Sequence, residues 1–261
     1  MSIWVLILLC VVQGLTEFLP VSSSGHLLFI EQVFHVSGNL MFLNLFLHIS
    51  TLLAVVIVYR KVILELLKKP FQPYTLKLLI ATICTVVLAF VYEYFKIDNV
   101  VTKIYPFGFL TTSMLLMACH LFQKKCVAMR TNELSMKNSV LVGMVQGVAV
   151  IPGLSRSGST IASLMLAGND EKKAAEFSFL LSIPIIVGGF VLELLQTKNR
   201  IGLVAGNFNF LIYFVAFILT FIVSIIALKL TIKLLRKQKF IVFSIYTFLM
   251  FIVTFVLNYV I

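Results

Sequence analysis

Long apolar runs alternate with short polar connections along most of this chain. A helix that crosses a bilayer needs about 20 mostly apolar residues, and charges or turn-forming residues bound each run of that length here. Six stretches qualify as spanning helices: Met41–Tyr59, Leu76–Phe95, Ile104–Phe122, Phe177–Gln196, Phe208–Leu228 and Phe240–Ile261. Pro184 and Gly188–Gly189 lie inside the fourth, which predicts a kink or a close helix contact. The pattern predicts an all-α polytopic membrane protein with six transmembrane helices.

Two further apolar stretches, residues 3–36 and 140–168, are short and are interrupted by polar residues. Each predicts a short helix, a Pro/Ser/Gly break and a second short helix. This pattern is typical of a re-entrant hairpin, which enters the membrane and leaves it by the same face. Such irregular backbone is tolerated at membrane depth only where it is buried in protein or lines a watery cavity.

Composition favours a single integral membrane domain over residues 1–261. Hydrophobic residues make up 61% of the chain and charged residues 12%, against roughly 45–50% and about 25% in soluble domains. The first apolar run lacks both a basic leading segment and a small-residue cleavage site, so we expect it to remain in the mature protein. The four cysteines show neither metal-binding nor redox spacing.

Basic residues divide unequally between the two predicted sides of the membrane. If the hairpins do not cross, sixteen of the 21 Lys and Arg residues fall in the connections 60–77, 123–139, 169–176 and 229–239. Four lie on the other side, and Arg156 lies inside the second hairpin. Such an excess marks the cytoplasmic side and predicts that both termini are extracytoplasmic. Anionic lipid headgroups then account for the net charge of +11 without a nucleic-acid partner.

One segment of the chain occurs twice. Residues 12–27 align without a gap with residues 145–160, at an offset of 133, and six of the sixteen positions are identical. Both copies lie in the predicted hairpins, and each is followed by three predicted spans. An odd number of spans inverts the second copy, so we predict an inverted-topology repeat of about 1–130 and about 135–261. The two hairpins could then meet near the membrane midplane.

The two copies differ at positions that chemistry could use. The differing pairs are Glu17 with Val150, Ser23 with Arg156, and His26 with Ser159. Charged residues at bilayer depth are costly and usually functional. The first copy therefore supplies an acid and an imidazole, and the second supplies a guanidinium.

In the first copy, Gln13 and Glu17 are four residues apart and share one helical face. Pro20 ends that helix, a loop over 22–25 follows, and a second helix starts near His26. In the second copy a loop again leads into a helix N-terminus. Free backbone N–H groups and the helix dipole favour an anion there. The hydroxyl groups that would help to bind it are those of Ser22, Ser24, Ser155, Ser157 and Thr160.

This set of groups fits hydrolysis of a phosphoanhydride. The planar fork of Arg156 suits two phosphate oxygens and would neutralise the charge that develops on them. His26 could be the nucleophile or a general acid/base, and Ser23 or a water molecule is the alternative nucleophile. Glu17 could act as a base or hold a divalent cation.

Structural explanations of the same residues stay open at this point. Ser22 and Ser24 are equally compatible with helix packing, and Glu17 with Arg156 could be a structural ion pair. His48 lies inside a predicted span and either reaches the site or bonds a neighbouring helix.

Two motifs resemble those of a known family, the undecaprenyl-diphosphate phosphatases or bacitracin-resistance proteins. Residues 13–26, QGLTEFLPVSSSGH, are similar to the family's (E/Q)xxxE motif with its Ser-rich stretch and His. Residues 152–160, PGLSRSGST, resemble its PGxSRSxxT motif. The chain length, the pattern of spans and the distance between the motifs also fit, so the resemblance covers the whole chain.

The resemblance implies a bacterial plasma-membrane enzyme that converts a C55 polyprenyl diphosphate into the monophosphate carrier of peptidoglycan synthesis, and confers bacitracin resistance. The family's functional positions carry over to Gln13, Glu17, Ser23, His26 and Arg156. The family permits Gln at the first of these, which leaves Glu17 as the one carboxylate of the motif. Divalent cations, Mg²⁺ or Ca²⁺, are associated with activity in the family. Its fold is described as inverted repeats with two re-entrant hairpins.

Two other classes of function are compatible with a chain of this composition and layout. A lipid flippase or transporter could be built on the same inverted repeat, but it would not need an acid and an imidazole beside Arg156. A structural or receptor membrane protein leaves the charged hairpins unexplained. The expected partners are a polyprenyl diphosphate and membrane lipids, and no pattern indicates an oligomeric state.

Overall fold

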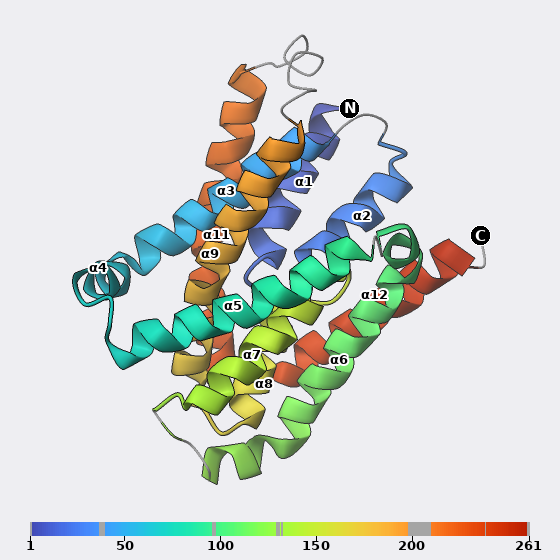
Figure 1. Ribbon diagram of the computed structural model, residues 1–261. Helices are drawn as coiled ribbons and strands as arrows, with labels where there is room; N and C mark the ends of the chain where they lie inside the picture. Colours follow the sequence, from blue (N-terminus) through green and yellow to red (C-terminus); the bar gives the residue numbers. More distant parts are fainter. Residues whose placement is uncertain are drawn as a thin grey trace.

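A computed structural model describes residues 2–36, 40–95, 98–128, 131, 133–197, 210–237 and 239–259. The regular secondary structure of these residues is helical, apart from one isolated backbone bridge. The helices (Figure 1) are α1 (Ile3–Thr16), α2 (Ser23–Val33), α3 (Met41–Val58), α4 (Arg60–Lys68), α5 (Pro73–Tyr94), α6 (Asp98–Ala128), α7 (Met136–Val148), α8 (Arg156–Leu166), α9 (Glu171–Thr197), α11 (Phe210–Arg236) and α12 (Phe240–Tyr259).

Five of the described helices are long and apolar enough to cross a membrane, within α5, α6, α9, α11 and α12. A sixth span arises if α3 and α4, which are bent by 77° relative to each other, count as one. The prediction of an all-helical, multi-pass membrane protein is confirmed. The connection 60–77, expected to be a polar loop, contains α4, because its charged and apolar residues segregate onto opposite helix faces.

The glycine pair in α9 does not make the helix contact that its sequence suggested. α9 continues through Pro184 from Glu171 to Thr197. A Cβ atom built at Gly188 or at Gly189 would meet no atom within 4 Å among the described residues. The two glycines therefore leave open space beside α9.

Each predicted hairpin contains two short helices that pack against each other, α1 with α2 and α7 with α8. These helices have 14, 11, 13 and 11 residues, fewer than the roughly 20 that a span needs. Ser2 and Ser135, which the offset of 133 relates, cap α1 and α7 by accepting backbone N–H bonds at 3.4 and 3.1 Å. The re-entrant path itself stays a prediction.

The first helix of each hairpin packs against a helix that is distant in sequence. α1 contacts α11, where Thr220 Oγ1 donates to the carbonyl of Cys10 at 3.3 Å. α7 contacts α5, where Thr85 Oγ1 donates to the carbonyl of Gly143 at 3.0 Å. Cys10 and Gly143 are again 133 residues apart. Two equivalent helix pairs therefore hold the two hairpins by the same kind of hydrogen bond.

Helices α6 and α12 lie side by side (Figure 1) and bond each other reciprocally. Ser113 Oγ donates to the carbonyl of Ser244 at 2.8 Å, and Ser244 Oγ donates to the carbonyl of Ser113 at 2.9 Å. Each serine hydroxyl thus donates its hydrogen bond to a backbone carbonyl of the other helix. These two bonds fix the register of α6 relative to α12.

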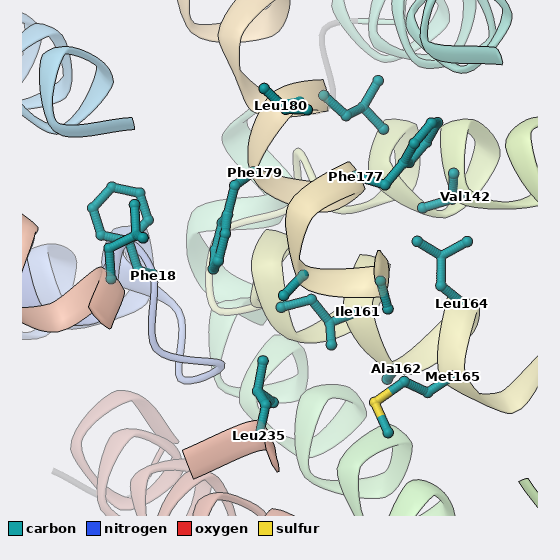
Figure 2. Packing of buried hydrophobic residues seen from close by; sticks show 14 of the residues in the cluster. Phe18, Val142, Ile161, Ala162, Leu164, Met165, Phe177, Phe179, Leu180 and Leu235 are labelled. Atoms are coloured by element: carbon teal, nitrogen blue, oxygen red, sulfur yellow. The ribbon is translucent and has the colours of Figure 1, made fainter. Parts of the chain in front are cut away.

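A buried apolar cluster packs around α8 and α9 (Figure 2). It includes residues of the loop that follows α1. Phe18 in this loop meets Phe179 of α9 edge to face, with ring centroids 5.6 Å apart. Phe18 is 1% exposed. Burying an aromatic ring of this size contributes about 2–3 kcal/mol, so the cluster anchors the position of the neighbouring Glu17.

Candidate active site

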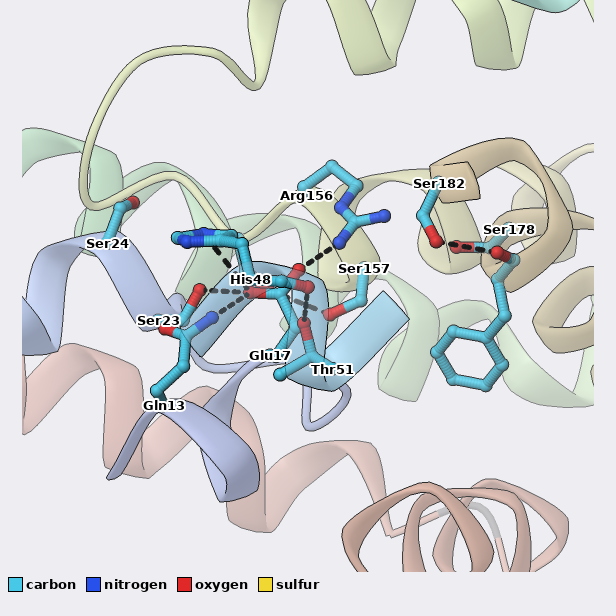
Figure 3. A network of polar contacts seen from close by, with 12 residues as sticks. Gln13, Glu17, Ser23, Ser24, His48, Thr51, Arg156, Ser157, Ser178 and Ser182 are labelled. Atoms are coloured by element: carbon cyan, nitrogen blue, oxygen red, sulfur yellow. Dashed lines mark hydrogen bonds and ion pairs between the residues drawn. The ribbon is translucent and has the colours of Figure 1, made fainter. Parts of the chain in front are cut away.

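The carboxylate of Glu17, at the end of α1, is the centre of a polar network (Figure 3). Ser23 Oγ donates to Glu17 Oε2 at 2.6 Å, and Gln13 Nε2 donates to the same oxygen at 3.2 Å. Arg156 Nη2 forms an ion pair with the other oxygen, Oε1. Glu17 is only 6% exposed. The network joins the two predicted hairpins through a partly buried charge pair.

His48 adds a third element to this network. Its Nε2 atom lies 4.0 Å from Glu17 Oε2, and its Nδ1 lies 2.7 Å from the carbonyl oxygen of Asn44, one turn earlier on α3. The sequence left open whether His48 reaches the site. It does, as a neighbour of the carboxylate from α3.

The loop of the first hairpin is closed by a serine cap. Ser22 Oγ accepts the backbone N–H of Gly25 at 3.3 Å and lies 3.5 Å from Ser24 Oγ. This cap satisfies one of the free N–H groups at the start of α2. The backbone of Ser22 has φ of +72°, a left-handed conformation that is uncommon outside glycine.

The loop of the second hairpin has the same cap. Ser155 Oγ accepts the backbone N–H of Gly158 at 3.0 Å, and the N–H of Ser155 donates to Thr112 Oγ1 at 2.9 Å. Here the left-handed residue is Gly153, with φ of +83°. A Cβ at Gly153 would clash with the carbonyl oxygen of Tyr105, so this close approach to α6 requires glycine.

The remaining predicted binding hydroxyls are satisfied by the protein. Ser157 Oγ donates to the carbonyl of Leu19 at 3.1 Å, which ties the second loop to the first. Thr160 Oγ1 lies 2.6 Å from Ser178 Oγ on α9 and donates to the carbonyl of Arg156 at 2.8 Å. Thr160 therefore fixes α8 against α9, and it lies outside the cavity described next.

A cavity of about 360 Å³ opens beside Glu17 and Arg156. Its polar wall consists of residues from both loops and from α3 and α7: Thr16, Glu17, Ser22, Ser23, Ser24, Asn44, His48, Gln146, Ser155, Arg156 and Ser157. Its apolar wall consists of residues from α3, α9 and the segment before the second loop: Leu45, Ile49, Ala149, Val150, Leu154, Ile185, Ile186, Gly189 and Phe190. One side can therefore hold a charged group while the other holds a hydrocarbon.

Two of the predicted catalytic residues do not line this cavity. Gln13 is fully buried and acts on Glu17 alone within the described network. His26 points its ring toward α12, where Nε2 lies 2.7 Å from the Tyr246 hydroxyl. The structure thus brings together Glu17, Ser23 and Arg156 at the cavity, with His26 behind its wall.

The cavity wall offers few ligands for a divalent cation. Among the described residues no group of three or more His, Cys, Asp and Glu side chains could hold a metal ion. Glu17 is the carboxylate on the wall, and Arg156 and Ser23 already occupy its two oxygens. The buried oxygens Asn44 Oδ1 and Gln146 Oε1 accept no hydrogen bond from described residues. These three residues supply the oxygen ligands that Mg²⁺ and Ca²⁺ prefer.

The model of a protein family, bacitracin resistance protein BacA, matches residues 6–253. The chain belongs to the BacA family. An undecaprenyl-diphosphatase of Carboxydothermus hydrogenoformans is 32% identical over 253 residues, covering 97% of this chain and 96% of that protein. Undecaprenyl-diphosphatases of Treponema denticola and Parabacteroides distasonis are 35% and 36% identical, each covering 94% of both chains.

Some residues of this BacA-family cavity were not singled out from the sequence. Asn44 and Gln146 carried no motif signal, although Gln146 aligns with Gln13 across the internal repeat. Tyr246, the partner of His26, had no signal at all, because it lies in an uninterrupted apolar run. The repeat alignment could have identified Gln146, and only the packing of α12 could identify Tyr246.

Proposed function

We propose that this chain hydrolyses undecaprenyl diphosphate to undecaprenyl phosphate and inorganic phosphate. Its family membership and the names of its relatives support this substrate. The observation that supports the chemistry is the partly buried Glu17–Arg156 pair on the polar wall of a cavity that also has an apolar wall. A lipid diphosphate matches both walls of that cavity. The activity would recycle the lipid carrier of peptidoglycan synthesis and would confer bacitracin resistance.

Arg156 is the group that would bind the terminal phosphate. A guanidinium has five N–H donors in a planar fork, and among the described residues its side chain bonds only Glu17. A phosphate that enters the cavity can therefore take over part of the guanidinium without breaking other bonds. Arg156 is also the first residue of α8, whose N-terminal dipole favours an anion. Both effects stabilise the charge that grows on the phosphoryl oxygens.

Glu17 and Ser23 would supply the attack. The Ser23 hydroxyl already donates to Glu17 Oε2 at 2.6 Å, the geometry that a general base needs. As Ser23 Oγ bonds to the terminal phosphorus, its proton passes to Glu17, and the bond to the bridging oxygen breaks to release undecaprenyl phosphate. Water then hydrolyses the phosphoserine, with the proton returned to Ser23. A water held by Glu17 could also attack directly.

The apolar wall would hold the first part of the prenyl chain. Ile185, Ile186, Gly189 and Phe190 on α9 face Leu45 and Ile49 on α3. A Cβ at Gly189 of this wall, or at the adjacent Gly188, would meet no described atom within 4 Å, which leaves room for a hydrocarbon chain there. A chain of 55 carbons cannot fit in about 360 Å³, so most of it would remain in the bilayer.

A divalent cation would bind through Glu17 and the amide oxygens of Asn44 and Gln146. When bound, it would neutralise charge on the diphosphate. Mg²⁺ is usually held by one or two carboxylates together with substrate phosphates, which suits a wall with a single carboxylate.

We further infer an inverted repeat in the bacterial plasma membrane, with both termini outside the cytoplasm. The paired contacts of α1 with α11 and of α7 with α5 support it, as do the reciprocal bonds of α6 and α12. The excess of basic residues on one predicted side supports the orientation. This arrangement would bring both loops to the cavity from opposite faces.

The test is release of inorganic phosphate from undecaprenyl diphosphate by purified protein in detergent, with Glu17→Ala as the comparison. We expect turnover by the natural sequence and none above background by the variant. No release by either, together with full complementation by Glu17→Ala in cells that lack other such phosphatases, would refute the proposal. Transbilayer movement of the lipid in vesicles by that inactive variant would favour a flippase.

A further inference from the structure

The ring of His26 is fully engaged by protein groups. Nδ1 lies 2.6 Å from the carbonyl oxygen of Ser22, and Nε2 lies 2.7 Å from the Tyr246 hydroxyl. The His26 and Tyr246 rings are stacked, with centroids 5.6 Å apart and planes 3° apart. Phe109 meets the His26 ring edge to face at 5.3 Å. His26 is 6% exposed and does not line the cavity.

These contacts fix the tautomer of His26. A carbonyl oxygen can only accept, so Nδ1 must carry the proton that it gives to Ser22. In the neutral ring, Nε2 is then the acceptor for the Tyr246 hydroxyl. Neither nitrogen is left to attack phosphorus or to protonate a leaving group in this arrangement.

The carbonyl that His26 binds belongs to the left-handed residue of the first loop. Ser22 has φ of +72°, and its carbonyl also accepts the backbone N–H of His26 at 3.3 Å. In the second loop the aligned Ser155 has an ordinary φ of −69°. There the residue aligned with His26 is Ser159, whose buried hydroxyl has no partner among the described residues. The imidazole thus occurs only in the loop whose capping serine has a left-handed backbone conformation.

Ser22 directly precedes Ser23, the residue whose hydroxyl donates to Glu17. We propose that His26 and Tyr246 are positioning residues of the phosphatase site. Tyr246 holds the ring of His26, the ring holds the carbonyl of Ser22, and this carbonyl sets the direction of the Ser23 hydroxyl. The proposal rests on the function proposed above, and neither residue touches the substrate.

Substitutions of His26 separate positioning from acid–base chemistry. The amide of His26→Asn can donate to Ser22 from near the place of Nδ1, but it cannot transfer a proton. His26→Gln is the matched control, because its longer side chain places the amide nearer to Nε2. We expect kcat of His26→Asn to stay within about tenfold of the natural protein. His26→Gln and His26→Ala should lose about a hundredfold or more, a loss within the range for general acid–base groups. KM should change by less than about twofold, since no substrate contact is removed.

Tyr246→Phe removes only the hydroxyl and keeps the stacked ring. We expect it to lower kcat by about three- to tenfold, with KM unchanged, because the ring loses one of two hydrogen bonds. If His26→Asn fails to fold, this variant decides: a loss confined to kcat supports the positioning role, and unchanged kcat overturns it.

Histidine ¹⁵N NMR tests the contact without turnover. Comparing the natural protein with His26→Asn assigns the signal, and we expect a protonated Nδ1 with an unprotonated Nε2 that shifts in Tyr246→Phe. Failure of the natural protein to release phosphate would refute the proposed function, while this tautomer would still support the contact. A protonated Nε2 overturns the proposal. So does His26→Asn that is folded but as inactive as His26→Ala, or phosphate trapped on His26.

Discussion

In the loop between α1 and α2 the left-handed residue is Ser22, whereas in the loop between α7 and α8 it is Gly153. Both loops nevertheless end in the same way, with a serine hydroxyl accepting the N–H of a glycine three residues later. The second loop needs its glycine because α6 approaches closely at Tyr105. The first loop has a residue with a Cβ atom at its left-handed position, and the carbonyl of this Ser22 is bonded by His26.

The comparison separates residues that build the loops from residues that act in them. Among the positions that are identical in both copies, Ser22 with Gly25 and Ser155 with Gly158 form the caps, and Gly14 and Gly147 lie at close contacts with α11 and α5. The positions that differ, Glu17 and Ser23 in one copy and Arg156 in the other, meet across the cavity. Two segments of similar sequence thus present a carboxylate with a hydroxyl from one hairpin and a guanidinium from the other.

The largest effect should follow from Glu17→Gln in the first hairpin. The amide keeps the shape of the side chain but cannot accept a proton, and it leaves Arg156 without its counter-charge. We expect kcat/KM for phosphate release to fall about a thousandfold, within the range for a general base. Glu65→Gln on the exposed face of α4 is the matched control and should keep its activity. Activity within tenfold of the natural protein would show that the first hairpin does not supply the base.

Arg156→Lys tests the second hairpin in the same assay. A single ammonium cannot replace a bidentate fork, and loss of one such stabilising group costs about 10²–10³ in rate. We expect a loss of about a hundredfold, against no change for Arg60→Lys at the exposed start of α4. Near-normal turnover would mean that charge alone, and not the fork, binds the phosphate.

Gly153→Ala and Ser22→Gly test how strongly each of the two positions with positive φ requires glycine. We expect Gly153→Ala to lower the free energy of unfolding by about 3 kcal/mol, from the left-handed backbone and the clash with Tyr105 together. Ser22→Gly should cost only a few tenths of a kcal/mol, because glycine tolerates positive φ and still serves as a cap. Thermal unfolding in detergent measures both. Equal losses would contradict the difference between the loops.

A smaller effect than that of Gly153→Ala should come from removal of the serine caps by alanine. Ser22→Ala and Ser155→Ala each remove one side-chain acceptor for a backbone N–H, a loss of about 1 kcal/mol. The same unfolding measurement should give similar values for both. A loss in only one hairpin would argue against a shared capping role.

The spanning helices were predictable because length and apolarity alone define them. α4 was missed because its charges made it look like a connection, although those charges lie on one face of a helix. At Gly188–Gly189 the sequence suggested tight packing, and the structure has open space. Small residues permit close contact, but only the position of neighbouring helices determines whether it occurs.

Within the site, Glu17, Ser23 and Arg156 were predictable because they fall in two short motifs that place polar residues inside apolar stretches. The direction of the His26 ring was not, since it depends on Tyr246, which is 220 residues away in the chain. His48 and Gln146 likewise reach the cavity through helix packing. Motifs identify groups that can react, while contacts between distant helices decide which of them face the substrate.

The packing of α1 against α11 also bears on how the protein is made. Cys10 and Thr220, which bond at this contact, are 210 residues apart. At translation rates of about 5–20 residues per second, α1 remains without this partner for roughly 10–40 s after its own synthesis. Glu17 likewise lacks Arg156, which is 139 residues away, for about 7–28 s at the same rates. The site can therefore be completed only late in translation, and a ribosome that stalls before α11 would leave an acidic hairpin without the helix that covers it.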